Sequence, residues 1–167
     1  MATLLVRLTF VAALAAAAFY GLSFRGKSKW LSYGRLSFHA TVTGVLLSAA
    51  FLLFLLLTHQ FQYTYVWKYS SIDLPTPLLI STLYAGQEGS FLLWALFTAV
   101  IGVFLMSYTA RRGYEAPVMA VYALIQAFLL LMLVVKDPFE HVWDTFPGEV
   151  EVGFVPVDGR GLNPLLQ

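Results

Sequence analysis

The chain has 167 residues, of which 59% are hydrophobic and 11% are charged, and its formal net charge is +1. Ordinary soluble domains carry about 25% charged residues, so the composition excludes that class. The small net charge gives no reason to expect a nucleic-acid partner, and a chain without cysteine forms no disulfide and no thiolate metal site. Apolar runs of about 20 residues recur, which is the length of a membrane-spanning helix. The sequence therefore predicts an all-α integral membrane protein surrounded by lipid.

The first two apolar segments predict two membrane-spanning helices. The first covers about residues 8–22 and is short, Ala-rich and preceded by Arg7. These features also fit a cleavable signal peptide, but most nearby positive charges follow the segment, which favours an uncleaved helix with its N-terminus outside. The second span covers about residues 38–58. The loop between the two spans is basic, with Arg25, Lys27, Lys29 and Arg35.

A long polar-aromatic loop follows, over residues 59–89. Its start alternates polar and aromatic side chains through Gln60-Phe61-Gln62-Tyr63-Thr64-Tyr65, which indicates either a strand or a segment at the membrane interface. Residues 78–84 are apolar but too short to span a membrane, and we expect them to lie in the interface as a helix.

The loop ends in Gly86-Gln87-Glu88-Gly89-Ser90, directly before Phe91-Leu92-Leu93-Trp94. The two glycines allow either a tight turn or the close approach of another part of the molecule. Ser90 is a candidate N-cap for the helix that follows, and Glu88 is placed at the positive end of its dipole. A helix-capping turn is the simplest interpretation of this pattern.

The third and fourth spans cover about residues 90–108 and 117–135. Gln126, near the middle of the fourth, is expected to hydrogen-bond to a neighbouring helix. Residues 136–167 form an acidic tail, with turn signals at Pro147-Gly148 and Asp158-Gly159 and a strand-like alternation over residues 149–152. Glu140 and His141 are adjacent, but a single histidine with nearby acids is weak evidence for a metal, so we expect a solvated loop and no metal site.

The positive charges predict the orientation of the four helices. The loops after the first and third spans hold Arg25, Lys27, Lys29, Arg35, Arg111 and Arg112, whereas the opposite side holds only Lys68, Lys136 and Arg160. Basic loops favour the cytoplasm. Both termini, the aromatic loop and the acidic tail are then expected outside.

Three stretches resemble the CcmF-type haem lyases of cytochrome c maturation, a family that includes the NrfE proteins. Residues 65–75 are similar to the family's first large periplasmic loop. Residues 86–94 are similar to its Gly-(His/Gln)-Glu-Gly-Ser-Leu-Leu-Leu-Trp signature, at Gly86, Gln87, Glu88, Gly89, Ser90 and Trp94. Residues 161–167, with Asn163 and Pro164, resemble the stretch ahead of the family's first periplasmic haem-ligand histidine.

The resemblance implies the N-terminal part of a multi-pass haem lyase in the bacterial cytoplasmic membrane. In that family haem arrives on a periplasmic haem chaperone, is held on a Trp-rich segment between histidine ligands, and is attached to apocytochrome c. Those histidines and the Trp-rich segment lie beyond Gln167, and His39, His59 and His141 match none of them. We therefore expect no catalytic or haem-binding residue in this chain, and a haem bound by the assembled lyase.

By this resemblance the chain acts mainly as a scaffold for a partner that carries the remainder of the lyase. Glu88 would order the turn or hydrogen-bond the Trp-rich segment. Two other interpretations stay open, a nonfunctional truncated fragment and a helical subunit of another respiratory membrane complex. The middles of the four spans hold no ionisable residue, which weighs against a proton-path subunit.

Overall fold

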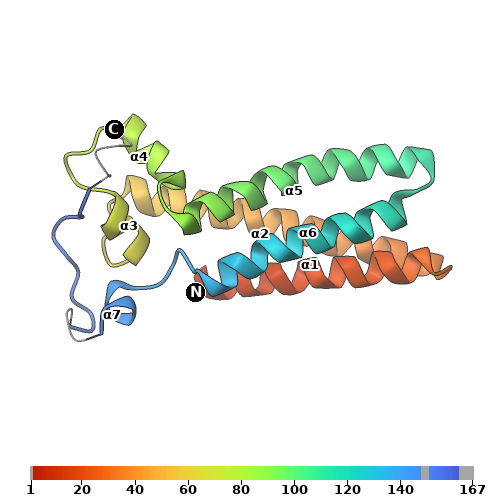
Figure 1. The fold of residues 1–167 in the computed structure, drawn as a ribbon, viewed down its shortest axis with the longest axis horizontal. Helices are drawn as coiled ribbons and strands as arrows, with labels where there is room; N and C mark the ends of the chain where they lie inside the picture. Colours follow the sequence, from red (N-terminus) through yellow and green to blue (C-terminus); the bar gives the residue numbers. More distant parts are fainter. Residues whose placement is uncertain (1, 148–150, 162–167) are drawn as a thin grey trace.

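The computed structural model describes residues 2–147 and 151–161. Four long helices form an elongated bundle (Figure 1): α1 (Ala2–Phe24), α2 (Leu31–Leu57), α5 (Gln87–Arg112) and α6 (Glu115–Val135). Helices α1 and α5 each pack against both α2 and α6. All four are long and apolar enough to span a membrane, α2 together with the 3-10 turn η1 (Ser28–Trp30) before it. The expected helical class with four candidate spans is thereby confirmed.

Each long helix begins earlier than the apolar run that predicts it. Hydropathy marks the part of a helix that sits in lipid, whereas the backbone hydrogen bonds continue through flanking polar residues. Arg35 consequently lies inside α2 and not in the preceding loop. Pro117 is the third residue of α6, within the first turn, where a backbone N–H has no helical partner to lose.

A fully buried polar contact joins α5 and α6 in the bundle interior, as the sequence predicts. Gln126 is fully buried, and its side-chain Nε2 donates a hydrogen bond to the Ala95 carbonyl oxygen at 3.1 Å. Small buried residues such as Ala13, Ala99 and Ala123 let the helix backbones approach closely elsewhere in this core.

Short elements gather at one end of the bundle, which we call the loop end (Figure 1). They are α3 (Thr64–Tyr69), α4 (Thr76–Ser81), the 3-10 turn η2 (Thr82–Tyr84) and α7 (Val142–Thr145). Elements α4 and η2 confirm the short helix expected within the loop over residues 59–89. The alternating stretch from Gln60 forms turns as far as Tyr63 and then enters α3 at Thr64, and no strand occurs within residues 2–147 and 151–161. The predicted turn at Pro147-Gly148 and alternation over residues 149–152 lie partly outside the described residues.

The segment after α6 is held against the start of α3 by backbone hydrogen bonds. The Thr64 N–H donates to the Glu140 carbonyl oxygen at 2.8 Å, and the Val142 N–H donates to the Gln62 carbonyl oxygen at 3.0 Å. Tyr63 and His141 form a single antiparallel bridge between them. Two main-chain bonds therefore dock this segment on the aromatic loop, while the Glu140 side chain stays exposed, as expected of a solvated loop.

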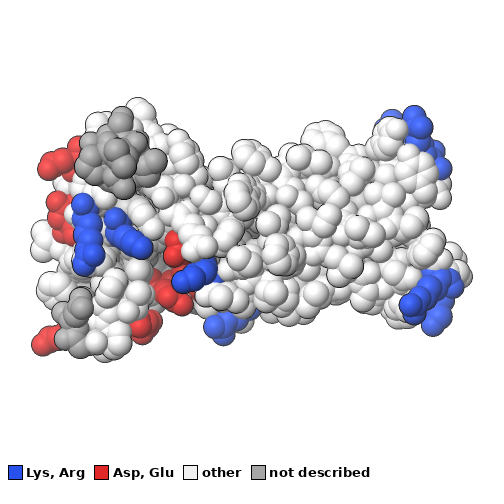
Figure 2. Space-filling model, in the orientation of Figure 1, with Lys and Arg blue, Asp and Glu red and all other residues white. Residues whose placement is uncertain are grey.

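Charged residues gather at the two ends of the bundle, and its sides are uncharged (Figure 2). On the face shown, Asp and Glu occur only at the loop end, while the opposite end, which we call the basic end, carries Lys and Arg. The basic end contains the α1–α2 and α5–α6 connections. The start of α1 and residues 151–161 both lie at the loop end (Figure 1).

Candidate functional site at the loop end

The turn before α5 is held by Tyr65, a buried residue of α3. Its hydroxyl donates a hydrogen bond to the Thr82 carbonyl oxygen at 2.8 Å and accepts one from the Gly86 N–H at 3.2 Å. A Cβ atom at Gly89 would lie 2.0 Å from this hydroxyl and 2.1 Å from the Leu83 carbonyl oxygen, and one at Gly86 would lie 2.8 Å from the Tyr65 ring. The glycines thus permit a close approach by α3, one of the two roles that the sequence leaves open.

Helix α5 begins at Gln87, because Gly86 is its N-cap. Gly86 has an extended backbone, with φ −107° and ψ 168°, and its carbonyl oxygen accepts the helical hydrogen bond from the Ser90 N–H at 3.0 Å. The Ser90 hydroxyl donates to the Tyr84 carbonyl oxygen at 3.1 Å. The predicted N-cap role of Ser90 is therefore wrong, whereas Glu88 lies in the first turn, where the helix dipole favours it.

Two motif residues of α5 face away from this turn. Gln87 is exposed, and Trp94 is 55% exposed on the side of the bundle, with its ring centroid 5.8 Å from that of Phe91. Trp94 therefore contacts lipid when α5 spans a membrane.

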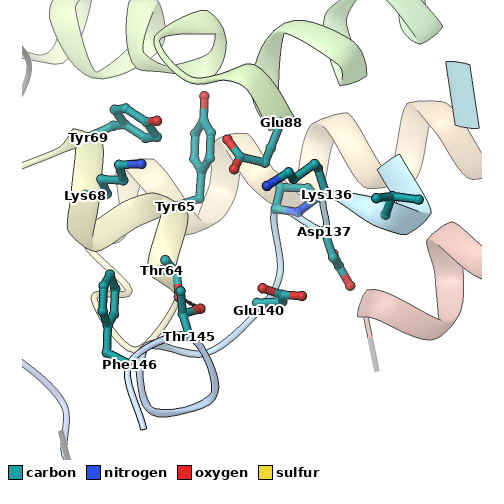
Figure 3. Close-up of a pocket in the computed structure, with 12 residues that line it drawn as sticks. Thr64, Tyr65, Lys68, Tyr69, Glu88, Lys136, Asp137, Glu140, Thr145 and Phe146 are labelled. Atoms are coloured by element: carbon teal, nitrogen blue, oxygen red, sulfur yellow. Dashed lines mark hydrogen bonds between the residues drawn. The ribbon is translucent and has the colours of Figure 1, made fainter. Parts of the chain in front are cut away.

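A cavity of about 240 Å³ lies beside the turn, between α3, the start of α5 and the segment after α6 (Figure 3). Its lining combines carboxylates, lysines and aromatic rings, and includes Glu88, Asp137, Glu140, Lys68, Lys136, Tyr65, Tyr69 and Phe146. Glu88 projects from the start of α5 toward α3 (Figure 3), and its Oε2 atom is buried and has no hydrogen-bond partner among the residues that the structure describes. Among described residues, neither lining lysine lies within 4.0 Å of a carboxylate oxygen.

The carboxylates that line the cavity form no salt bridge with a lysine or arginine among the described residues. Burial raises the pKa of Glu140, and the negative charges of Asp137 and Asp144 raise that pKa further. The Lys68 ammonium lies 5.2 Å from the centroid of the Tyr69 ring. Burial also raises the pKa of Tyr65, so its hydroxyl is a neutral donor at physiological pH. Among the described residues, the cavity's carboxylates thus form no salt bridge with a lysine or arginine, although the charge of Lys136 partly offsets the rise in the pKa of Glu140.

Residues 158–161 lie against the other end of α3. The Arg160 N–H donates to the Trp67 carbonyl oxygen at 2.7 Å, and the Gly161 N–H donates to the Ser70 carbonyl oxygen at 3.0 Å. The Arg160 guanidinium stacks over the Trp67 ring, 4.2 Å from its centroid. Helix α3 therefore contacts the glycine turn through Tyr65 and the tail through its C-terminal end.

The stretches that resemble the haem lyases come together around this short helix. Residues 65–75 include most of α3, and Tyr65 joins them to residues 86–94. The tail contact at Gly161 brings in the beginning of the third stretch. Its motif residues Asn163 and Pro164 lie outside the described residues.

The three histidines do not build a metal centre. His39 is exposed on α2 toward the basic end, and His59 follows α2 with a φ of 51° and a buried, unpartnered Nδ1. The His141 ring stacks between those of Tyr63 and Trp143, with centroid distances of 5.0 and 4.6 Å. Within residues 2–147 and 151–161, no group of three or more His, Cys, Asp and Glu side chains could hold a metal ion.

Sequence reasoning misses a partly buried ion pair at the basic end. Arg35 of α2 donates to both carboxylate oxygens of Glu115 in α6, at 2.8 and 2.5 Å. The Tyr20 hydroxyl of α1 donates to the same carboxylate at 3.2 Å. The only signal in the sequence is a lone acidic residue at the start of an apolar segment, because its partners lie 80 and 95 positions away.

Comparison with known proteins gives relatives that cover most of this chain. The cytochrome c-type biogenesis protein CcmF of Pseudomonas fluorescens is 31% identical over 147 residues, which are 85% of this chain and 21% of that protein. CcmF of Pseudomonas aeruginosa is 32% identical over 157 residues, covering 87% and 21%. The cytochrome c-type biogenesis protein NrfE of Haemophilus influenzae is 30% identical over 125 residues, covering 72% and 18%.

No family model and no solved structure matches the chain. The chain spans about a fifth of the length of the curated relatives that it matches. The resemblance read from its sequence is confirmed by these alignments. Over that fifth, the chain is a homologue of the CcmF and NrfE cytochrome c-type biogenesis proteins.

Proposed function

We propose that this chain supplies the N-terminal membrane part of a haem lyase complex, which attaches haem to apocytochrome c outside the bacterial cytoplasmic membrane. The four helices span that membrane with the basic end in the cytoplasm and the loop end on the periplasmic side. The remainder of the lyase, with its Trp-rich segment, is the main partner, and a periplasmic haem chaperone delivers the haem. The assembled lyase binds the haem, and this chain acts as its scaffold.

The observation that carries this proposal is the gathering of the lyase-like stretches around α3. The relatives that share them are named for cytochrome c biogenesis. Tyr65 and the two glycines fix the position of α3 against α5, and α3 in turn holds residues 158–161. A scaffold of this kind needs rigid positioning and not a reactive side chain, which agrees with the chemistry present at the loop end.

The test uses the source bacterium. Deletion of the coding sequence is expected to remove holocytochrome c while apocytochrome c is still made, and re-expression restores it; haem-stained gels and immunoblots measure both. In this background Gly89→Ala is expected to lower the yield severalfold, because the new methyl group overlaps the Tyr65 hydroxyl and a backbone carbonyl, at a cost of about 1–3 kcal/mol. Membrane levels of the variant are measured in parallel.

The matched control is Gly21→Ala, since a Cβ atom there meets nothing within 4 Å. This variant should restore the full yield. The proposal fails if deletion leaves holocytochrome c unchanged. It also fails if the tagged chain copurifies with a respiratory complex and not with the haem chaperone and the rest of the lyase.

A further inference from the structure

We propose that the loop-end cavity binds the guanidinium group of an arginine side chain presented by another polypeptide. This site goes beyond the scaffold role, and its binding chemistry does not depend on haem attachment. Three features of the cavity carry the inference: an unpartnered carboxylate, aromatic walls, and a volume suited to a side chain.

The first feature is the state of Glu88. Its Oε2 atom is buried and accepts no hydrogen bond from any described residue. A buried acceptor without a donor costs free energy, and the cost is greater for a charged group. Asp137 and Glu140 line the same cavity and add negative charge. A positively charged donor supplies the missing hydrogen bond to Glu88 and also neutralises part of the negative charge.

The second feature is the aromatic lining. Tyr65, Tyr69 and Phe146 line the cavity on the side of α3, beside the carboxylates (Figure 3), and planar guanidinium groups stack on such rings while they donate hydrogen bonds in their own plane. The protein already uses this contact next to the cavity. Arg160 lies 5.9 Å from the centroid of Phe146 and 4.2 Å from that of Trp67.

The third feature is the volume of the cavity and the separation of its carboxylates. The cavity measures about 240 Å³, far more than the roughly 10–15 Å³ that one water molecule needs. Its carboxylates do not converge into a group that could hold a metal ion in the described residues. A guanidinium with five donors in a plane can reach separated acceptors, which a single small ion cannot do.

Two lysines, Lys68 and Lys136, line the same cavity and can compete with an incoming guanidinium for its carboxylates. The Lys68 ammonium lies over the Tyr69 ring and not on a carboxylate. Lys136 makes no ion pair within 4.0 Å with any described carboxylate, yet its positive charge repels an incoming guanidinium. Removal of the Lys136 charge should therefore strengthen binding, whereas loss of the Glu88 charge should weaken it.

The experiment measures binding of arginine methylamide to the full chain in detergent micelles, by saturation-transfer NMR at constant ionic strength. Citrulline methylamide has the same shape without the charge and serves as the ligand control. Arginine methylamide should bind and citrulline methylamide should not. Glu88→Gln should weaken binding about tenfold or more, the loss expected of a charge-assisted hydrogen bond. Lys136→Met should strengthen it severalfold.

Glu151→Gln is the matched control, since this exposed residue carries the same charge and does not line the cavity. It should bind as the unmodified chain does. Thermal unfolding of each variant checks that the fold is kept. Equal binding of the two methylamides overturns the proposal, as does unchanged binding by Glu88→Gln. Binding only after Lys136→Met also overturns it, because the cavity is then closed by its own lysine.

Discussion

At the basic end, the buried carboxylate of Glu115 receives hydrogen bonds from Arg35 and Tyr20, whereas at the loop end Glu88 keeps a buried oxygen that no described residue contacts by a hydrogen bond. Both acids lie in the first turn of a long helix, where the dipole favours them equally. The difference therefore comes from their neighbours. A glutamate in the first helical turn thus makes a fixed structural contact at the basic end and leaves an open site at the loop end.

This contrast suits a helical scaffold. The basic end ties α1, α2 and α6 together through one carboxylate, so its geometry depends on residues of the bundle alone. The loop end is held at α3 by Tyr65 and by the tail, and it leaves a cavity beside them. A partner can bind at the loop end without disturbing the contacts that hold the bundle.

The largest expected effect separates the two acids directly. Glu115→Ala leaves the Arg35 guanidinium and the Tyr20 hydroxyl without their acceptor, and we expect a loss of about 2–3 kcal/mol in the free energy of unfolding. The value lies at or below the low end for buried pairs, because the Arg35 side chain is 46% exposed. Unfolding by sodium dodecyl sulfate in mixed micelles, followed by circular dichroism, measures it.

Glu88→Ala is the counterpart in the same assay. It removes no hydrogen bond that the structure shows, so it should not lower the free energy of unfolding by more than roughly 0.5 kcal/mol, and relief of the buried unpaired oxygen favours an increase. Equal losses for the two variants would mean that Glu88 has a partner within the chain, and the contrast between the two ends would disappear.

A smaller effect concerns two stacked arginines, one at each end. Arg160→Ala removes the guanidinium from the Trp67 ring, a contact of about 1 kcal/mol, so the amides of residues 160 and 161 should exchange hydrogen roughly fivefold faster. Arg112→Ala removes a similar contact, 4.7 Å from the Tyr108 ring centroid, and should leave those amides unchanged. Mass spectrometry of peptides from the tail follows the exchange. Unchanged exchange rates in Arg160→Ala would mean that the backbone hydrogen bonds alone hold residues 160 and 161 against α3.

Hydropathy was sufficient to predict the four long helices, because each one exposes apolar side chains along most of its length. It also marked Gln126 as a buried hydrogen-bonding residue, since an amide in the middle of an apolar span has few other partners. The strand-like pattern from Gln60 was misleading. That stretch forms turns through Tyr63, and the six-residue helix that begins at Thr64 is stabilised by tertiary contacts, among them the burial of Tyr65, which local periodicity does not encode.

The glycine turn shows the same limit at the candidate site. Its residues indicated that something approaches closely, but the sequence does not say that the approaching group is a phenol 21 positions earlier. The Arg35–Glu115 pair was hidden for the same reason, as its members are 80 positions apart. Contacts of this kind depend on how the bundle folds back on itself, and their residues carry no mutual spacing that a single sequence reveals.

The smallest expected effect is the pH dependence of the loop end. Burial and nearby carboxylates raise the pKa of Glu140 in the folded chain, so the folded state holds this proton more tightly than the unfolded state. The resulting stabilisation is complete below the unfolded pKa, about 4.3, and is lost as pH rises through the folded pKa. The side chain is exposed, so solvent screening keeps the loss small.

Detergent unfolding at several pH values between 4 and 7.5 should therefore show a slight fall in stability with rising pH, and Glu140→Gln should flatten it. Asp73→Asn, at another exposed acid of the loop region, is the control and should leave the fall in place. If Glu140→Gln shows the same fall in stability with rising pH as the unmodified chain, the group that titrates is not Glu140. A flattened one would show that the loop end gains stability when its negative charge is neutralised, by a proton at low pH and, by the same electrostatics, by a bound cation at neutral pH.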